Sequence, residues 1–127
     1  MDNTIVIATG KVHMDASGIV FVENAATREQ TIDDARECLR AVKQASLGTR
    51  RPLLVDLTIA AKQTPECQRL YASPEAAEQV TAVALVTPSM LGRVMGNIAI
   101  GLSTTSIPLK LFNSVADAHR WLMDYRL

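Results

Sequence analysis

The stretch of residues 81–113 is the part of the chain that most limits its possible folds. It reads TAVALVTPSMLGRVMGNIAIGLSTTSIPLKLFN, and only Arg93 and Lys110 in it carry a charge. Its hydrophobic pattern predicts a strand, a helix that starts at Thr87-Pro88, and a second strand. Because exposed apolar surface is unfavourable in water, the rest of the chain must cover such a βαβ unit.

Length and composition indicate one compact domain over residues 1–127. The chain is 48% hydrophobic and balances 13 basic against 13 acidic side chains, which is typical of a soluble α/β domain. A net charge near zero argues against nucleic-acid binding, which needs a concentrated positive surface. The N-terminus has no basic region, and no apolar run reaches membrane-spanning length without interruption. We therefore expect a cytoplasmic protein without a membrane span.

The chain before residue 81 predicts a hairpin, a helix and a strand. Residues 4–14 predict one strand with a bulge at Gly10, and a turn separates it from a second strand at residues 19–22. Thr31 and Asp34 form a capping-box pattern at the start of a helix that Gly48 ends. The next run reads PLLVDL, which is typical of a central strand buried on both faces.

Further helix starts follow, each marked by a hydroxyl residue. Thr64 and Ser73 both precede Pro and Glu, and Ser114 precedes the last helix. Together these signals predict a single α/β domain with a mostly parallel open sheet of about five strands. The sheet begins with the hairpin, continues with alternating helices and strands, and is flanked by about four helices.

Three segments carry a resemblance to a known family, and together they cover much of the chain. They read LLVDL at residues 53–57, AVALVTPSMLGRVMGN at residues 82–97 and IPLKLFNSVADAHRWL at residues 107–122. With the hairpin and the strand that ends in Asp56, they resemble the STAS domains of anti-sigma factor antagonists. The chain is more closely similar to uncharacterised bacterial proteins grouped with them as STAS/Sec14-like. This resemblance implies the STAS fold, and its motifs are structural rather than catalytic.

One segment departs from the STAS pattern. In the antagonists, a phosphorylated Ser lies in an Asp-Ser-Ser-Gly-like turn a few residues after the Asp that ends the strand. Asp56 matches that Asp, but the turn here, residues 62–67, reads KQTPEC and has neither Ser nor Gly. Thr64 is the nearest hydroxyl. It is open to two interpretations, a helix cap or a surviving phosphorylation switch.

The segment after the PLLVDL strand holds the candidate regulatory or ligand loop. Asp56 lies at the carboxyl end of a central parallel strand, where open α/β sheets place their ligands. An Asp in this position equally often caps a loop or a helix, so both interpretations of Asp56 stay open. Asp56, Thr58 and Thr64 are the candidate residues of this loop.

The predicted helix of residues 89–103 has one side that is poor in charge. Met90, Arg93, Asn97 and Ile100 share that side, where a solvated helix normally shows several charges. A second subunit, a partner protein, a ligand or the chain itself could cover such a surface. We expect a homodimer in which these four residues form the contact.

The residues that carry most enzyme and metal chemistry are scattered. Cys38 and Cys67 lie in different predicted helices without a CxxC spacing, so we interpret them as reduced, buried thiols. His13 and His119 have no Cys, Ser or acid at the spacing of a metal site or a catalytic triad. We therefore expect no catalytic residue, no metal and no cofactor.

Two functional classes remain after these exclusions. The first and preferred class is a non-enzymatic regulatory or protein-interaction module of STAS type. The second is a domain that binds a small apolar ligand or a lipid, which the Sec14-like part of the resemblance and the apolar predicted helix suggest. An enzyme is the least expected class, because no nucleophile and base can be paired in the sequence.

Overall fold

The computed structural model describes residues 3–59, 61–87 and 107–126, and in them one sheet of six strands. Each strand lies beside its neighbour in the sequence. Strands β1, β2 and β3 pair antiparallel, and β3 to β6 pair parallel. The predicted α/β class with a mostly parallel open sheet is confirmed. The elements are β1 (Ile5–Ile7), β2 (Gly10–Met14), β3 (Val20–Asn24), α1 (Ile32–Ala45), β4 (Arg51–Asp56), α2 (Pro65–Tyr71), α3 (Pro74–Ala77), β5 (Val80–Val86), β6 (Leu109–Phe112), α5 (Val115–Leu122) and a final 3-10 turn, η1 (Met123–Tyr125).

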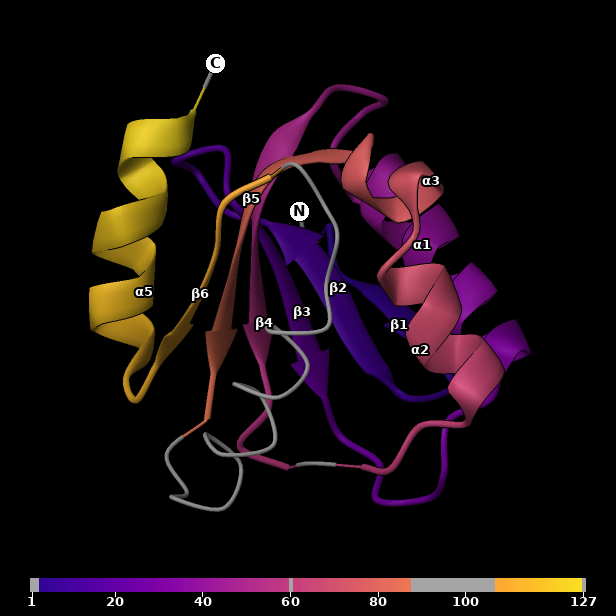
Figure 1. Ribbon diagram of the computed structural model, residues 1–127. Helices are drawn as coiled ribbons and strands as arrows, with labels where there is room; N and C mark the ends of the chain where they lie inside the picture. The colour runs from indigo at the N-terminus through magenta and orange to yellow at the C-terminus, as the bar shows by residue number, and fades with distance from the viewer. Residues whose placement is uncertain (1–2, 60, 88–106, 127) are drawn as a thin grey trace.

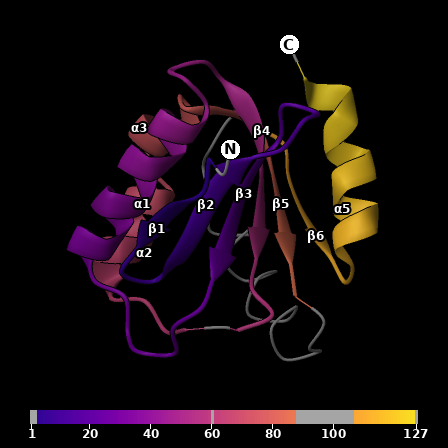
Figure 2. The same cartoon turned by 180° about the vertical axis from the view of Figure 1, so that it is seen from behind.

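Helices lie on both faces of this sheet. In Figures 1 and 2, α1, α2 and α3 gather on one face, and α5 is the one described helix on the other. The first face buries a core that includes Val12 and Val42, and the second buries a core that includes Leu54 and Leu122. This three-layer arrangement gives each apolar helix face a sheet face to pack against.

The structure corrects the prediction for residues 4–14, because two strands replace the single bulged one. Strands β1 and β2 pair with each other, with Ile7 opposite Gly10 and the turn at residues 8–9 between them. The Thr9 carbonyl accepts a hydrogen bond from the Ala25 N–H, 2.8 Å away. Gly10 then passes so close to Glu23 that a Cβ atom there would lie 1.9 Å from the Glu23 carbonyl oxygen. Gly10 therefore marks a tight approach to the neighbouring strand and not a bulge.

Strand β4 lies inside the sheet, as the PLLVDL run predicted. It pairs with β3 on one side and β5 on the other. Leu54 is fully buried under α5, whereas Leu53 and Val55 on the opposite face are half-buried among the described residues. Complete burial is thus seen on one face of β4.

Helix α1 starts and ends where the sequence predicted. The carboxylate of Asp34 accepts a hydrogen bond from the Thr31 N–H at 2.8 Å, which is the acidic half of a capping box. The same carboxylate binds both terminal nitrogens of Arg28, at 2.8 and 2.7 Å. At the other end, Gly48 has φ +75° and donates its N–H to the Lys43 carbonyl. These hydrogen bonds hold Asp34 in its ionised form, and its pKa lies well below its usual range because of Arg28 first and the Thr31 N–H next.

Replacing Asp34 with Asn is expected to lower the free energy of unfolding by about 1 kcal/mol at pH 7, the usual value of a helix cap. A carboxyl whose pKa is lowered on folding stabilises the fold above its unfolded pKa of about 4, and that contribution fades as the pH falls below it. The difference between the two proteins should therefore shrink when urea unfolding is repeated at pH 3. Asp33→Asn, an exposed change in the same helical turn, is the control and should cost less at pH 7. An equal loss in both variants would contradict this role of Asp34.

Candidate functional site

The carboxyl ends of four parallel strands meet at one edge of the sheet. The arrowheads of β3, β4, β5 and β6 all point to this edge in Figure 2. Glu23, Asp56, Val86 and Phe112 lie side by side there in the strand register. The described residues between β4 and α2, 57–59 and 61–64, lie at this edge, and we call them the β4–α2 loop. This is the edge at which open α/β sheets place their ligands.

Asp56 and Thr58 are brought together at the start of the β4–α2 loop. The Oδ1 atom of Asp56 accepts the Thr58 N–H at 2.9 Å and the Thr58 hydroxyl at 2.6 Å. These two hydrogen bonds close a local turn, and the Leu57 N–H continues the sheet by donating to the Val86 carbonyl. Asp56 therefore caps the start of the loop, and its role in binding a ligand stays a prediction. Thr58 itself is exposed.

Thr64 lies at the other end of the loop and caps α2. Its hydroxyl oxygen accepts the Cys67 N–H at 3.2 Å, and its own N–H donates to the Gln30 carbonyl at 2.9 Å. The Thr64 side chain is half-buried, and Pro65 occupies the first helical position as predicted. The helix-cap interpretation of Thr64 is therefore confirmed.

A buried polar network fastens the loop to the rest of the fold. Asn24 and Gln30 are 7% and 9% exposed, and the Gln30 side-chain amide donates to the Asn24 side-chain oxygen at 2.9 Å. The Asn24 amide nitrogen donates to the carbonyls of Ala26 and Ile59. The Gln30 N–H also donates to the Lys62 carbonyl at 2.8 Å. These bonds hold the described backbone at Ile59 and Lys62, because each buried polar group has a partner that it would lose on movement.

The sequence analysis missed this network. Asn24 lies two residues after the second predicted strand and Gln30 precedes the helix cap, but no spacing connects either residue to Ile59. The network also fixes the backbone beside Ile59, whose apolar side chain is 43% exposed. The only sequence signal for an exposed role of Ile59 was its position, since it is an apolar residue that lies beyond the end of a predicted strand and directly after Thr58. Ile59 thus joins Thr58 as an exposed residue on a backbone that is held in place.

The four residues predicted to form a dimer contact cannot be placed. Met90, Arg93, Asn97 and Ile100 lie in the segment 88–106, outside the described residues.

The rings of the two histidines both lie against the ring of Phe21, on the α5 side of the sheet. The Nε2 atom of His119 lies 2.8 Å from Oδ2 of Asp15, to which it donates a hydrogen bond. The other oxygen of Asp15 accepts the N–H groups of Ser17 and Ile19, at 2.9 and 3.0 Å. The pair therefore ties the turn between β2 and β3 to α5. His13 stacks on Phe21 with ring centroids 5.1 Å apart.

Both cysteines are free and buried, as expected from their spacing. Burial raises the pKa of the Cys67 thiol to about 11, so the thiol is protonated and unreactive at neutral pH. Burial also raises the pKa of Cys38. Within the described ranges, no three residues among His, Cys, Asp and Glu come together as metal ligands would.

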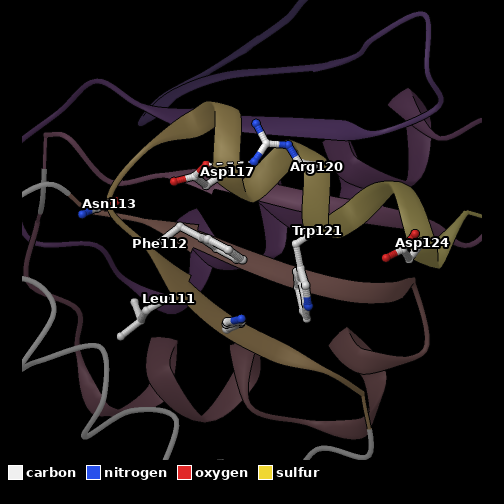
Figure 3. A pocket seen from close by; sticks show the side chains of 8 residues that line it. Leu111, Phe112, Asn113, Asp117, Arg120, Trp121 and Asp124 are labelled. Atoms are coloured by element: carbon white, nitrogen blue, oxygen red, sulfur yellow. Dashed lines mark hydrogen bonds and ion pairs between the residues drawn. The ribbon is translucent and has the colours of Figure 1, made fainter.

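An open groove of about 550 Å³ runs between strand β6 and helix α5 (Figure 3). The rings of Phe112 and Trp121 form its floor, with centroids 5.5 Å apart. The Lys110 ammonium lies 5.3 Å from the centroid of the Phe112 ring. Leu111 and four charged or polar residues complete its lining: Asn113, Asp117, Arg120 and Asp124. The groove is thus aromatic at its base and charged at its rim.

The fold and the family follow from comparisons with other proteins. A crystal structure of an uncharacterised protein of the DUF3478 family from Shewanella loihica PV-4, described as having a SpoIIAA-like fold, is similar to this chain with a TM-score of 0.60. The two share 15% sequence identity, and the match covers 94% of this chain and 90% of the other. This supports the predicted STAS-like fold.

No curated protein matches the sequence. In the described part of the chain, no helix has the length and apolar character that crossing a membrane would need. A family model, Domain of unknown function (DUF7793), matches residues 13–126. The chain therefore belongs to the DUF7793 family.

Proposed function

We propose that this protein is a non-enzymatic regulatory module of STAS type that binds a partner protein through the β4–α2 loop. The observation that carries this proposal is the combination of a fixed loop backbone and exposed side chains. Asn24 and Gln30 hold the loop from beneath, while Thr58 and Ile59 face outward. A loop that is already ordered loses little conformational entropy on binding, which favours recognition.

The described polar residues support binding rather than catalysis. Asp56 is engaged with Thr58, and the Asp15 carboxylate holds a turn with one oxygen while the other binds His119. Both thiols are buried and protonated. An acid–base or nucleophilic mechanism needs a pair of groups that face a substrate. A protein that acts by contact alone is the simplest function for this set of residues.

The proposed partner binding does not need phosphorylation at Thr64. The Thr64 hydroxyl already accepts a backbone hydrogen bond and is half-buried.

Buried, unpaired cysteines also support action in the cytoplasm, where thiols stay reduced.

A homodimer is part of this proposal.

The alternative class, a binder of small apolar ligands or lipids, has weaker support. The groove between β6 and α5 is open, and four charged side chains line it, whereas sites for apolar ligands are mostly enclosed and apolar.

The proposal predicts that Ile59→Arg weakens partner binding at least tenfold, because apolar anchors at the centre of a contact dominate its energy. The measurement is quantitative affinity capture from lysate of the source cell, followed by titration of the purified partner. Leu47→Arg is the matched control. Leu47 is 78% exposed in the turn before β4, at the opposite end of that strand, and its replacement should leave binding unchanged.

Two replacements of Thr64 complete this experiment. Thr64→Asp keeps an N-cap, so it should leave stability and partner binding unchanged, whereas Thr64→Ala should cost about 1 kcal/mol of stability. Equal binding by Ile59→Arg and wild type would contradict the proposed surface. Loss of binding by Thr64→Asp at unchanged stability would show that a phosphorylation switch controls the contact.

A further inference from the structure

Strand β6 is the last strand of the sheet, and one of its two edges is unpaired among the described residues. The carbonyls of Pro108 and Phe112 accept hydrogen bonds from the Val83 and Thr87 N–H groups of the β5 side. Since backbone groups alternate in direction along a strand, the groups of Leu109, Leu111 and Asn113 point to the open edge. Such an edge is a template for another strand.

We propose that two copies of the chain associate through this edge, with their β6 strands antiparallel around a two-fold axis at Leu111. The proposal commits to a second copy because the edge is complementary to itself. A two-fold axis perpendicular to the sheet pairs residues whose numbers differ by zero or an even number. The paired side chains then lie on the same face of the combined sheet. The edge-facing backbone of Leu111 then lies opposite that of Leu111 in the second copy, which is a hydrogen-bonded pair.

This register places complementary side chains opposite each other. Lys110 faces Phe112 of the second copy, and its ammonium already lies 5.3 Å from the Phe112 ring of its own strand. Cations bind favourably over aromatic rings. A register centred on Lys110 would instead oppose two ammonium groups, which is unfavourable. The opposed charges therefore favour the register centred on Leu111 over the register centred on Lys110.

The groove beside β6 supports a contact between identical copies. Its lining holds two bases, Lys110 and Arg120, and two acids, Asp117 and Asp124. A surface with both signs and no net charge meets its own copy without overall repulsion. This contact is separate from the β4–α2 loop. It rests on the homodimer of the proposed function and places the dimer contact at β6 instead of at the four residues expected from the sequence. Its failure would leave the proposed partner surface untouched.

The register is tested by disulfide cross-linking of the full chain with oxidised glutathione. Across the axis, the two Leu111 Cα atoms would lie about 5.5 Å apart, within the range that a disulfide spans. The two Leu109 Cα atoms would lie about 14 Å apart, four residues along the strands. Leu111→Cys should therefore form a covalent dimer, and Leu109→Cys should not. Cys38 and Cys67 are buried and stay outside the reaction.

A second measurement keeps the inference testable if Leu111→Cys does not fold. Wild type should sediment as a dimer at about 100 μM, a concentration at which weak dimers form. Lys110→Glu alters an exposed side chain and should raise the dimer dissociation constant at least tenfold. The proposal is wrong if wild type is monomeric, if Leu109→Cys cross-links as readily as Leu111→Cys, or if Lys110→Glu leaves the dissociation constant unchanged. The double variant Met90→Glu and Ile100→Glu should leave the dimer dissociation constant unchanged. If this double variant is monomeric while Lys110→Glu stays dimeric, the contact lies in the segment 88–106 and the proposal is wrong.

Discussion

Gly10→Ala is expected to destabilise the protein by about 3 kcal/mol, the upper part of the range for overpacked positions. The added methyl group would lie 1.9 Å from the Glu23 carbonyl oxygen and 3.0 Å from the Glu23 carbonyl carbon. Both atoms belong to the backbone of β3, which cannot turn away as a side chain could. Strands β2 and β3 would have to separate, and their pairing at Gly10 and Asn24 would be lost.

The measurement is urea unfolding of both proteins, followed by circular dichroism. Gly48→Ala is a useful control. Gly48 also has a conformation that favours glycine, with φ +75°, but no atom lies within 4 Å of the position that a Cβ would take. Its positive φ makes alanine cost roughly 1 kcal/mol there. A loss at Gly10 no larger than the loss at Gly48 would show that β2 and β3 adjust easily, against the present account of the first hairpin.

Asn24→Asp is expected to cost about 3 kcal/mol at pH 7, because it leaves buried carbonyls without donors and adds a buried charge. The Asn24 amide donates to the carbonyls of Ala26 and Ile59. A carboxylate cannot donate, and it would repel both oxygens. Only the hydrogen bond from Gln30 would survive. The β4–α2 loop should therefore loosen as well as the fold weaken.

Two measurements separate these effects. Urea unfolding gives the stability, and hydrogen exchange gives the protection of the Thr64 and Gln30 amides, which bond across the same junction. Asn113→Asp is the matched control, since Asn113 is exposed at the end of β6, and it should change neither quantity. Unchanged exchange in Asn24→Asp would mean that the network does not order the loop.

The parts of the fold that the sequence predicted are encoded by neighbouring residues. The hydroxyl side chains of Thr64, Ser73 and Ser114 each accept an N–H three residues later, as their patterns predicted. Helix caps are readable because donor and acceptor lie within one turn. The apolar runs that became β4 and β5 are equally local signals.

The parts that the sequence did not predict depend on residues far apart in the chain. His119 and Asp15 are 104 positions apart, and Asn24 and Ile59 are 35 positions apart. The need for glycine at position 10 was misread as a bulge because it comes from the close approach of the Glu23 carbonyl, 13 positions along the chain. Such contacts depend on how strands pair, which a single sequence does not state.

Native mass spectrometry of the purified protein tests most directly whether this is an interaction module or a ligand carrier. The account predicts a mass of two chains with no retained small molecule. The opposite result, a single chain that carries one small molecule in stoichiometric amount, would contradict the account and favour the ligand-binding class.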